Sequence, residues 1–340
     1  IAMAQSYAST IDAELEVPLD AVRTLAQAYA VLRADGEDVS RDTVIAMQRQ
    51  VLANNPEFVG TGVGWEPDAF DGRDADYVNA PGHDATGRFI PYWARGEGGK
   101  IELEPLVGYD VDEWYMCPKQ THQECIVEPY LYPIQGEDVL MTTLIAPIMF
   151  EGQFYGVVGI DIRVDSLQAF ADAVDVYDGA GKINIITYDG TLVGATGHPD
   201  LAGKPATELH PHFAKELPSI QAGEISQDYY DGQLEVFYPI ILGHTNTPWA
   251  IAVMIPQSEI IAPARLLIRQ MLIISLGLIA LAFGLLWVAS GQLARPIKKI
   301  TNVALAVARG DLFQKIDVQQ ADEIGQLADA LRTMSNSLQA

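Results

Sequence analysis

The chain has 340 residues, of which 49% are hydrophobic and 19% charged, and its formal net charge is −24. Single cores stop growing at about 250–300 residues, so this length predicts two or three domains. The negative charge argues against nucleic acid as a partner. Residues 1–265 hold 40 acidic and 14 basic residues, whereas residues 266–340 hold 5 and 7. We interpret the acidic part mainly as a solvated surface, with attraction of cationic ligands as the second interpretation.

Two helices are predicted at the start of the chain. Apolar residues recur at helical spacing from residue 1 to about residue 35, which predicts one long helix with a kink at Pro18. A second helix is predicted from Arg41 to Ala53, capped by Ser40 or Asp42. Because the sequence starts within the first helical pattern, we expect a first membrane-spanning helix upstream of it.

Short β-like runs separated by turn residues follow, and they form two groups. The first group covers residues 58–65, 89–95, 139–150 and 154–162. Its last two runs flank a turn at Glu151 and Gly152 and predict a hairpin. After a helix predicted at Ser166–Val174, the second group covers residues 182–189, 191–197, 227–232, 233–240 and 249–256. This order predicts an α+β fold with two stacked modules.

The chain has two cysteines, Cys117 and Cys125, in a Pro- and Gln-containing stretch that we interpret as a loop. Their spacing allows one short-loop disulfide, two free thiols or part of a metal site, for which only His122 lies nearby. We predict the disulfide if this part of the chain lies outside the cytoplasm.

Residues Met271–Ser290 are twenty uncharged, apolar residues, the length that crosses a hydrocarbon layer of about 30 Å. A buried core helix is the alternative, but a soluble domain seldom tolerates a helix that is apolar on every face. Basic residues follow at positions 295, 298 and 299, and Arg265 and Arg269 precede the segment, so the flanking charges lean towards a cytoplasmic C-terminal side. We therefore predict the acidic part outside the cell and the last 50 residues inside.

Two further helices are predicted beyond this segment. Residues Ile297–Ala308 are apolar at helical spacing, residues 309–312 interrupt the pattern, and Asp322–Leu338 resume it. The second helix has an apolar seam suited to a helical bundle, at Ile324, Leu327, Leu331, Met334 and Leu338. So short a helix pair is marginal alone, and we expect it to pack against a second copy in a homodimer.

Two stretches resemble known families. Arg295-Pro296-Ile297, Ala308-Arg309-Gly310-Asp311-Leu312 and Asp322-Glu323-Ile324-Gly325-Gln326-Leu327 resemble a HAMP domain, in which two helices from each of two subunits form a four-helix bundle. The region before the membrane resembles the double Cache (dCache) sensor of methyl-accepting chemotaxis proteins and related sensor kinases. That resemblance is carried by residues 112–115, 128–130, 139–143, 146–148 and 156–162.

The resemblance implies a long helix that supports two PAS-like modules, with small ligands binding in the membrane-distal one. The expected boundaries are an extracytoplasmic sensor at 1–265 (distal module about 38–170, proximal module about 171–258), a transmembrane helix at 266–290 and a HAMP domain at 291–340. We expect a multi-pass protein of the inner membrane, with the sensor in the periplasm and HAMP in the cytoplasm. Its expected partners are a cytoplasmic output domain and downstream signalling proteins.

Amino-acid-sensing members of this family carry a motif that also suggests a site here. Four of its positions match: Trp114, Tyr115, Tyr130 and Asp161. Asp112 stands where the motif has an arginine, and Tyr132 stands where it has a second aspartate. Because the arginine's planar fork is what clamps an α-carboxylate, its loss argues against ordinary amino acids, although an amino-acid sensor remains an alternative.

We therefore predict a pocket with two carboxylates, Asp112 and Asp161, and aromatic walls. The candidate walls are Tyr92, Trp93, Trp114, Tyr115, Tyr130 and Tyr132. Aromatic faces and anions suit a cationic amine, such as a quaternary ammonium, an alkylamine or a polyamine. The alternatives are core packing for each aromatic residue, a structural hydrogen bond for Asp161 and a solvated loop position for Asp112.

The sequence contains no phosphate loop, metal-ligand spacing or nucleophile elbow, so we predict neither an enzyme nor a cofactor. His210 and His212 are close enough to chelate a metal, but we interpret them as surface loop residues. The predicted function is a transmembrane chemoreceptor. Its rivals are a sensor histidine kinase or cyclase receptor with the same input, a membrane-tethered ectoenzyme, and a sensor that recognises a partner binding protein.

Overall fold

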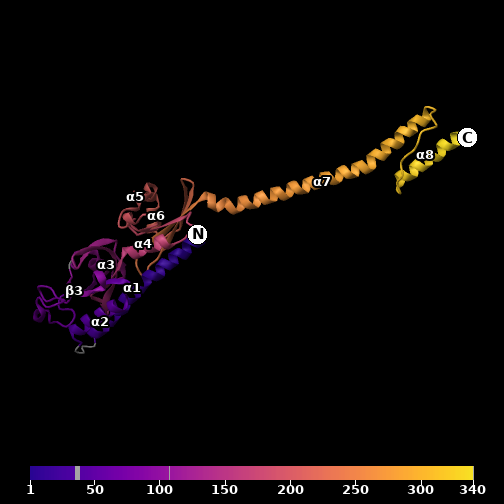
Figure 1. The fold of residues 1–340 in the computed structure, drawn as a ribbon. Coiled ribbons are helices and arrows are strands. Elements are labelled where there is room, and N and C mark those ends of the chain that lie inside the picture. Colours follow the sequence, from indigo (N-terminus) through magenta and orange to yellow (C-terminus); the bar gives the residue numbers. More distant parts are fainter. Residues whose placement is uncertain (35–38, 107, 340) are drawn as a thin grey trace. The chain divides into compact units, whose positions relative to one another are not determined.

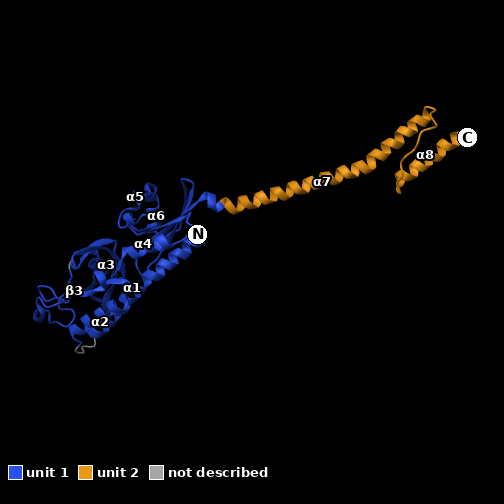
Figure 2. Ribbon diagram, viewed as in Figure 1, with its two compact units in different colours: residues 1–260 blue, residues 261–340 orange. Residues whose placement is uncertain are grey.

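The computed structural model describes residues 1–34, 39–106 and 108–339, and these form two compact units. Unit 1 covers residues 1–260 and unit 2 covers residues 261–340 (Figure 2). Unit 1 contains two antiparallel sheets, and unit 2 is helical (Figure 1). The predicted α+β class with two β modules and a helical C-terminal part is thus confirmed.

Helix α1 (Ala2–Ala34) is the long helix of unit 1 and runs along both modules (Figure 1). Its inward face places Ile11, Leu15 and Leu19 in the core. The helix packs on β6 (Glu137–Phe150) and β7 (Gln153–Arg163) of the first sheet and on β11 (Gln233–Ile240) and β12 (Trp249–Pro256) of the second. The helix continues through Pro18, whose ring removes one backbone donor without ending it. Both sheets therefore share one hydrophobic core against α1.

The first module consists of α2 (Arg41–Asn54), α3 (Glu113–Thr121) and a seven-stranded sheet in the order β3-β2-β1-β7-β6-β4, with β5 also paired to β6. Its strands are β1 (Phe58–Trp65), β2 (Pro91–Arg95), β3 (Ile101–Pro105), β4 (Cys125–Ile126), β5 (Tyr130–Ile134), β6 (Glu137–Phe150) and β7 (Gln153–Arg163). Two short 3-10 helices, Asp74–Tyr77 and Glu97–Gly99, lie in its loops. Ser40 caps α2 by accepting a hydrogen bond from the backbone of Thr43, one of the two caps that the sequence suggested.

The predicted hairpin of β6 and β7 is confirmed. Glu151 and Gly152 both have positive φ, as a two-residue turn that matches strand twist requires. The register then shifts by one residue between Ile148 and Met149, which is a β-bulge. Beyond this bulge Thr143 lies opposite Asp161.

A disulfide joins Cys117 to Cys125, with their Cα atoms 6.3 Å apart. The prediction that both cysteines lie in a loop is wrong, because Cys117 is in α3 and Cys125 is in β4. Pro118 suggested a loop, but α3 continues past it to Thr121, at the cost of the one backbone hydrogen bond that a proline cannot donate.

Helix α4 (Val164–Ala173) leads from β7 to the second module, where a five-stranded sheet has the order β10-β11-β12-β8-β9. The strands are β8 (Lys182–Ile186), β9 (Leu192–Ala195), β10 (Ser226–Tyr230), β11 (Gln233–Ile240) and β12 (Trp249–Pro256). Short helices α5 (Ala206–Leu209) and α6 (Leu217–Gln221), with 3-10 turns at Pro199–Leu201 and Pro211–Lys215, cover one face.

Helix α7 (Gln257–Ala308) is a single helix of 52 residues that includes the predicted spanning segment. Its most apolar 18-residue window has a mean hydropathy of 2.6 and no buried residue, so it is long and apolar enough to cross a membrane. The expected separate helix at Ile297–Ala308 is the end of α7, because Pro296 does not interrupt it.

Helix α8 (Glu323–Gln339) completes unit 2 and packs on the end of α7. Asp322 caps α8 by accepting hydrogen bonds from the backbone of Ile324 and Gly325. Within this single chain only Leu331 of the predicted seam is buried, whereas Leu327, Met334 and Leu338 are exposed.

Candidate functional site

The candidate site is a cavity on one face of the first sheet, between the strands and α3. Its lining comes from β1, β2, β5, β6, β7, α3 and the segment before α3. The lining residues are Gly62, Tyr92, Leu106, Trp114, Tyr130, Tyr132, Met141, Thr143, Gly159 and Asp161. None of these is a lysine or an arginine.

Strand alternation brings most of these side chains together. Residues two apart on one strand share a face, which aligns Tyr130 with Tyr132, Met141 with Thr143, and Gly159 with Asp161. The strand pairings then set these pairs side by side, with Tyr130 opposite Met141 and Thr143 opposite Asp161. On the far side of β7, Gly62 of β1 lies opposite both Gly159 and Tyr92.

Asp161 is the charged group of the cavity, and its side chain is 3% exposed. One carboxylate oxygen accepts a hydrogen bond from the Tyr92 hydroxyl at 2.8 Å, and the other accepts one from the Thr143 hydroxyl at 2.7 Å. Burial raises the pKa of Asp161, and the two hydrogen bonds oppose that rise. In the described ranges no basic side chain forms an ion pair with Asp161, so only neutral groups stabilise its charge.

Aromatic rings surround this carboxylate. The Tyr132 ring meets Tyr92 edge-on at 5.6 Å and Tyr130 edge-on at 6.2 Å between centroids. The Tyr130 hydroxyl lies 2.7 Å from the Thr143 hydroxyl, which in turn donates to Asp161. Burial followed by the charge of Asp161 raises the pKa of Tyr130 and of Tyr92, so both phenols stay protonated.

The cavity is narrow. The space open to the centre of a water molecule measures about 30 Å³, which is room for about two waters. Glycine on β1 is what allows Tyr92 and Asp161 to approach each other, because a Cβ at Gly60 would lie 2.2 Å from an Asp161 oxygen and 2.4 Å from the Tyr92 hydroxyl. The site therefore suits a small or flat ligand unless a wall side chain moves.

The structure brings five of the eight predicted site residues to this cavity. They are Tyr92, Trp114, Tyr130, Tyr132 and Asp161. Trp93 lies on the opposite face of β2, where its indole N–H donates to the Ile45 carbonyl at 2.8 Å and the Arg49 guanidinium lies over its ring. Neighbours on a strand face opposite sides, so Tyr92 and Trp93 cannot both line one cavity.

Tyr115 points away from the cavity. Its hydroxyl accepts a hydrogen bond from Arg88 and donates one to Glu66, while Trp114 meets its ring edge-on. Asp112 is exposed at the N-terminus of α3 and does not line the cavity.

Sequence reasoning missed five lining residues: Gly62, Leu106, Met141, Thr143 and Gly159. Thr143 is the important one, since it bonds both Asp161 and Tyr130. The turn at Glu151 and Gly152 was a usable signal, because it predicts which β6 residues face Asp161. Counted from the turn without a bulge, however, it would place Thr142 there.

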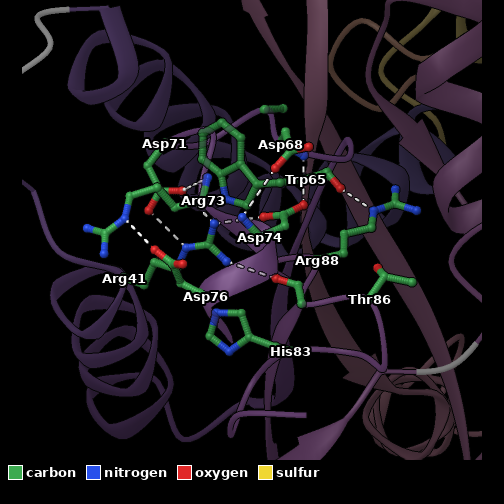
Figure 3. A network of polar contacts seen from close by, with 12 residues as sticks. Arg41, Trp65, Asp68, Asp71, Arg73, Asp74, Asp76, His83, Thr86 and Arg88 are labelled. Atoms are coloured by element: carbon green, nitrogen blue, oxygen red, sulfur yellow. Dashed lines mark hydrogen bonds and ion pairs between the residues drawn. The ribbon is translucent and has the colours of Figure 1, made fainter. Parts of the chain in front are cut away.

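A second polar cluster gathers around Arg41, the first residue of α2 (Figure 3). The buried guanidinium of Arg41 donates to Asp71 and Asp74 and to the Gly87 carbonyl, and Tyr77 covers its face. Because its donors are already used, we interpret Arg41 as a structural group that fixes this loop region rather than as a ligand contact.

The two histidines considered for a metal differ in their surroundings. His212 pairs with the buried Glu235 at 2.7 Å, and the rings of His210 and His212 lie 5.5 Å apart. Across the residues that the structure describes, no group of three or more His, Cys, Asp or Glu side chains is placed to hold a metal ion.

These features define a class of protein: an α+β sensor with two β modules and an apolar-walled cavity, joined to a membrane-spanning helix and a helical pair. Family models agree with this description. Residues 44–169 match the methyl-accepting chemotaxis protein-like first PDC sensor domain, and residues 288–340 match the HAMP domain.

Individual relatives point the same way. The chain is 31% identical over 329 residues to the methyl-accepting chemotaxis protein TlpQ of Pseudomonas aeruginosa, covering 88% of this chain and 46% of that protein. Among solved structures, the extracellular domain of the putative histidine kinase mmHK1S-Z3 has a TM-score of 0.67 and 30% identity, covering 77% of this chain and 95% of that one. Methyl-accepting Chemotaxis protein X has a TM-score of 0.61 and 26% identity, covering 74% and 94%.

The chain therefore belongs to the dCache–HAMP family of methyl-accepting chemotaxis proteins and related bacterial transmembrane receptors. It spans a little under half the length of TlpQ.

Proposed function

We propose that this protein is a transmembrane chemoreceptor whose first module binds a small cationic amine in the cavity around Asp161. One observation carries this proposal: a 97% buried carboxylate has no ionic partner in the described residues and is enclosed by aromatic rings. Burying a charge without a counter-charge is costly, so a bound ammonium group would offset a cost that the fold already bears at this site.

The lining chemistry favours a cation over other ligand classes. A carboxylate gives an ammonium a charge-assisted hydrogen bond, and each well-placed ring adds about 0.5–2 kcal/mol of cation–π attraction. A carboxylate ligand would meet the negative charge of Asp161 and no lysine or arginine. The same lack of a basic group disfavours amino acids as ligands. The replacement of the family's arginine by Asp112 already argued against them.

The proposed topology places unit 1 in the periplasm and the HAMP region in the cytoplasm, within a multi-pass protein of the inner membrane. The disulfide supports an oxidising compartment for unit 1, and the basic residues after the apolar segment support a cytoplasmic end. We further propose a homodimer, since the apolar side chains of Leu327, Met334 and Leu338 lack a partner within one chain.

For the output we propose control of chemotaxis through a downstream signalling domain. The similarity to TlpQ over 88% of this chain and the match of residues 288–340 to the HAMP domain support this output. A sensor kinase is the second candidate, because the extracellular domain of a putative histidine kinase is about as similar to unit 1. Swimming responses to the ligand in cells with and without this receptor distinguish taxis from kinase-controlled gene expression.

The ligand class is tested with a matched series on the membrane-embedded chain: n-butylammonium, n-butanol, n-butyrate and 4-aminobutyrate, with ethylammonium as a smaller cation. We expect the two simple cations to raise the thermal midpoint, since a ligand that binds only the folded state stabilises it. The alcohol, the anion and the zwitterion should have much smaller effects.

Asp161→Asn is the matched control, because it keeps the shape of the side chain and removes its charge. Removing one partner of a buried charge pair costs about 2–5 kcal/mol, so cation affinity should fall about 30-fold or more. Stabilisation by butyrate but not by butylammonium, or equal stabilisation of both variants by butylammonium, would refute the amine assignment.

A further inference from the structure

Hydrogen bonds between the two modules converge on one short segment that lies between α3 and β5. Gln123 accepts from the side chain of Asn246, Glu124 accepts from the backbone of His244, and Glu128 bonds to the turn between β8 and β9. We name residues 123–130 the connector segment. It belongs to the first module, and the partners that it has in the second module are all in loops or turns.

Glu128 makes two of these links. One carboxylate oxygen accepts from the Thr187 hydroxyl at 2.5 Å, and the other accepts from the backbone N–H of Asp189 at 3.1 Å. Thr187 is further fixed because its hydroxyl accepts from the backbone of Thr191 across the same turn. Glu128 thus holds the β8–β9 turn by two points, which fixes its orientation as well as its distance.

The other end of the connector segment is a wall of the cavity. Tyr130 lies two residues after Glu128, lines the cavity and contacts Thr143. Pro129 stiffens the link between Glu128 and Tyr130, because its ring fixes φ. Tyr130 and Glu128 are thus separated by two peptide units, in which Pro129 removes the freedom of one backbone dihedral.

The connector segment is also anchored where it begins. The disulfide ties Cys125 to α3, the helix that supplies Trp114 to the cavity. Glu124 forms an ion pair with Arg23 of α1. Beyond the β8–β9 turn, β8 pairs with β12, and β12 ends at Pro256, directly before α7.

We infer that the connector segment couples the cavity of the first module to the second module, with Glu128 as the positioning residue that passes a change at Tyr130 to the β8–β9 turn. The ligand class rests on the proposed function, whereas this path rests on the contacts of Glu128. Removing the Glu128 side chain should leave ligand binding in the cavity intact. It should break the link between the cavity and the β8–β9 turn.

The test measures amide hydrogen exchange by mass spectrometry on the full chain in lipid nanodiscs. The response is the change in exchange of residues 182–195 when the cavity is altered, either by Asp161→Asn or by saturating n-butylammonium. In the wild-type background we expect a change of about fivefold or more, the size of an ordinary coupling free energy. In the Glu128→Ala background the same alterations should change exchange there by less than about twofold.

Three variants make the result specific. Thr187→Val removes the hydroxyl that donates to Glu128 and leaves the sequence of the connector segment unchanged. It should weaken the response as Glu128→Ala does. Glu128→Gln keeps the shape but loses one of two acceptors, and should give an intermediate response. Glu137→Ala, an exposed position on the neighbouring strand β6, should respond as the wild type does.

A response of residues 182–195 that is equally large with and without Glu128 would overturn the inference. If n-butylammonium does not slow the amide exchange of residues 139–143 and 157–162 in the wild type, the amine assignment is wrong. The comparison with Asp161→Asn then still decides the role of Glu128. If Glu128→Ala lowers the thermal midpoint too far for comparison, Thr187→Val and Glu128→Gln provide the same test of the link.

Discussion

Asp161 shows how a single buried charge can prepare a protein for a ligand. The two hydroxyls of Tyr92 and Thr143 orient the carboxylate but bring no positive charge, so ionisation stays unfavourable and the pKa of Asp161 is raised. A cation entering the cavity would supply the missing charge. This missing charge is the basis of the amine binding proposed above.

The raised pKa of Asp161 predicts how binding depends on pH. Because the amine must meet an ionised carboxylate, affinity for n-butylammonium should increase as pH rises through the raised pKa of Asp161 and then level off. The amine itself stays protonated throughout, since aliphatic ammonium groups titrate near pH 10. Isothermal titration across this pH range should show the increase in the wild type and none in Asp161→Asn.

Stability should change in the opposite sense. Folding raises the pKa of Asp161 above its unfolded value, so the protonated carboxyl is the form favoured by the fold. Its contribution is full below the unfolded pKa and is lost as pH rises through the folded pKa. The ligand-free wild type should therefore lose stability relative to Asp161→Asn over that window, and a thermal midpoint that rose instead would contradict this assignment.

Gly60 predicts a steric test of the same site. Its Cβ would lie 2.2 Å from an Asp161 oxygen and 2.4 Å from the Tyr92 hydroxyl, so Gly60→Ala must push these groups apart. We expect a loss of amine affinity of about tenfold or more, as one misplaced group in a binding constellation produces. Gly64→Ala on the same strand is the control, because its nearest contact, 3.3 Å from a Tyr115 ring carbon, requires a shift of only a few tenths of an ångström. Equal affinities for the two variants would contradict this geometry.

Among the elements, the β6–β7 hairpin determines the site. The bulge next to Met149 adds one residue to β7 and shifts every later pairing by one, so Thr143 rather than Thr142 lies opposite Asp161. A one-residue shift moves a side chain to the other face of a sheet. Thr142 instead donates to the Val127 carbonyl and supports the connector segment.

The disulfide predicts the stability of the adjoining elements. It closes a loop of eight residues between α3 and β4, for which the chain-entropy model gives about 2–3 kcal/mol. Replacing Cys117 and Cys125 by serine should lower the free energy of unfolding by up to this amount. Urea denaturation monitored by tryptophan fluorescence measures the change, and a reducing agent should destabilise the wild type but not the double variant.

For the whole molecule, the charge distribution predicts the salt dependence of binding. Residues 1–265 hold 40 acidic and 14 basic residues, and such a field raises the local concentration of cations. We expect the association rate of n-butylammonium, measured by stopped-flow fluorescence, to fall as ionic strength rises and the field is screened. The rate for n-butanol, where any signal is seen, should not change. A cation rate that is independent of salt would show that the acidic surface has no part in capture.

Local patterns of residues were enough to predict several elements of this protein. Twenty uncharged apolar residues predict a membrane helix because a bilayer requires internal hydrogen bonding over a fixed thickness. The alternation around Glu151 and Gly152 predicts a hairpin, and the caps and apolar spacing predict α1, α2 and α8. These signals need no knowledge of distant residues.

Which aromatic residues face the cavity depends instead on how distant parts of the chain pack together. Tyr92 and Trp93 are equal candidates in the sequence, as are Trp114 and Tyr115, until strand pairing and the placement of α3 turn one of each pair inward. The β-bulge and the packing of five strands against α3 depend on contacts across the whole module. These contacts determine which side chains face the cavity. For a site built from neighbouring strands, the sequence therefore predicts the types of residue that line it, but not which individual side chains do so.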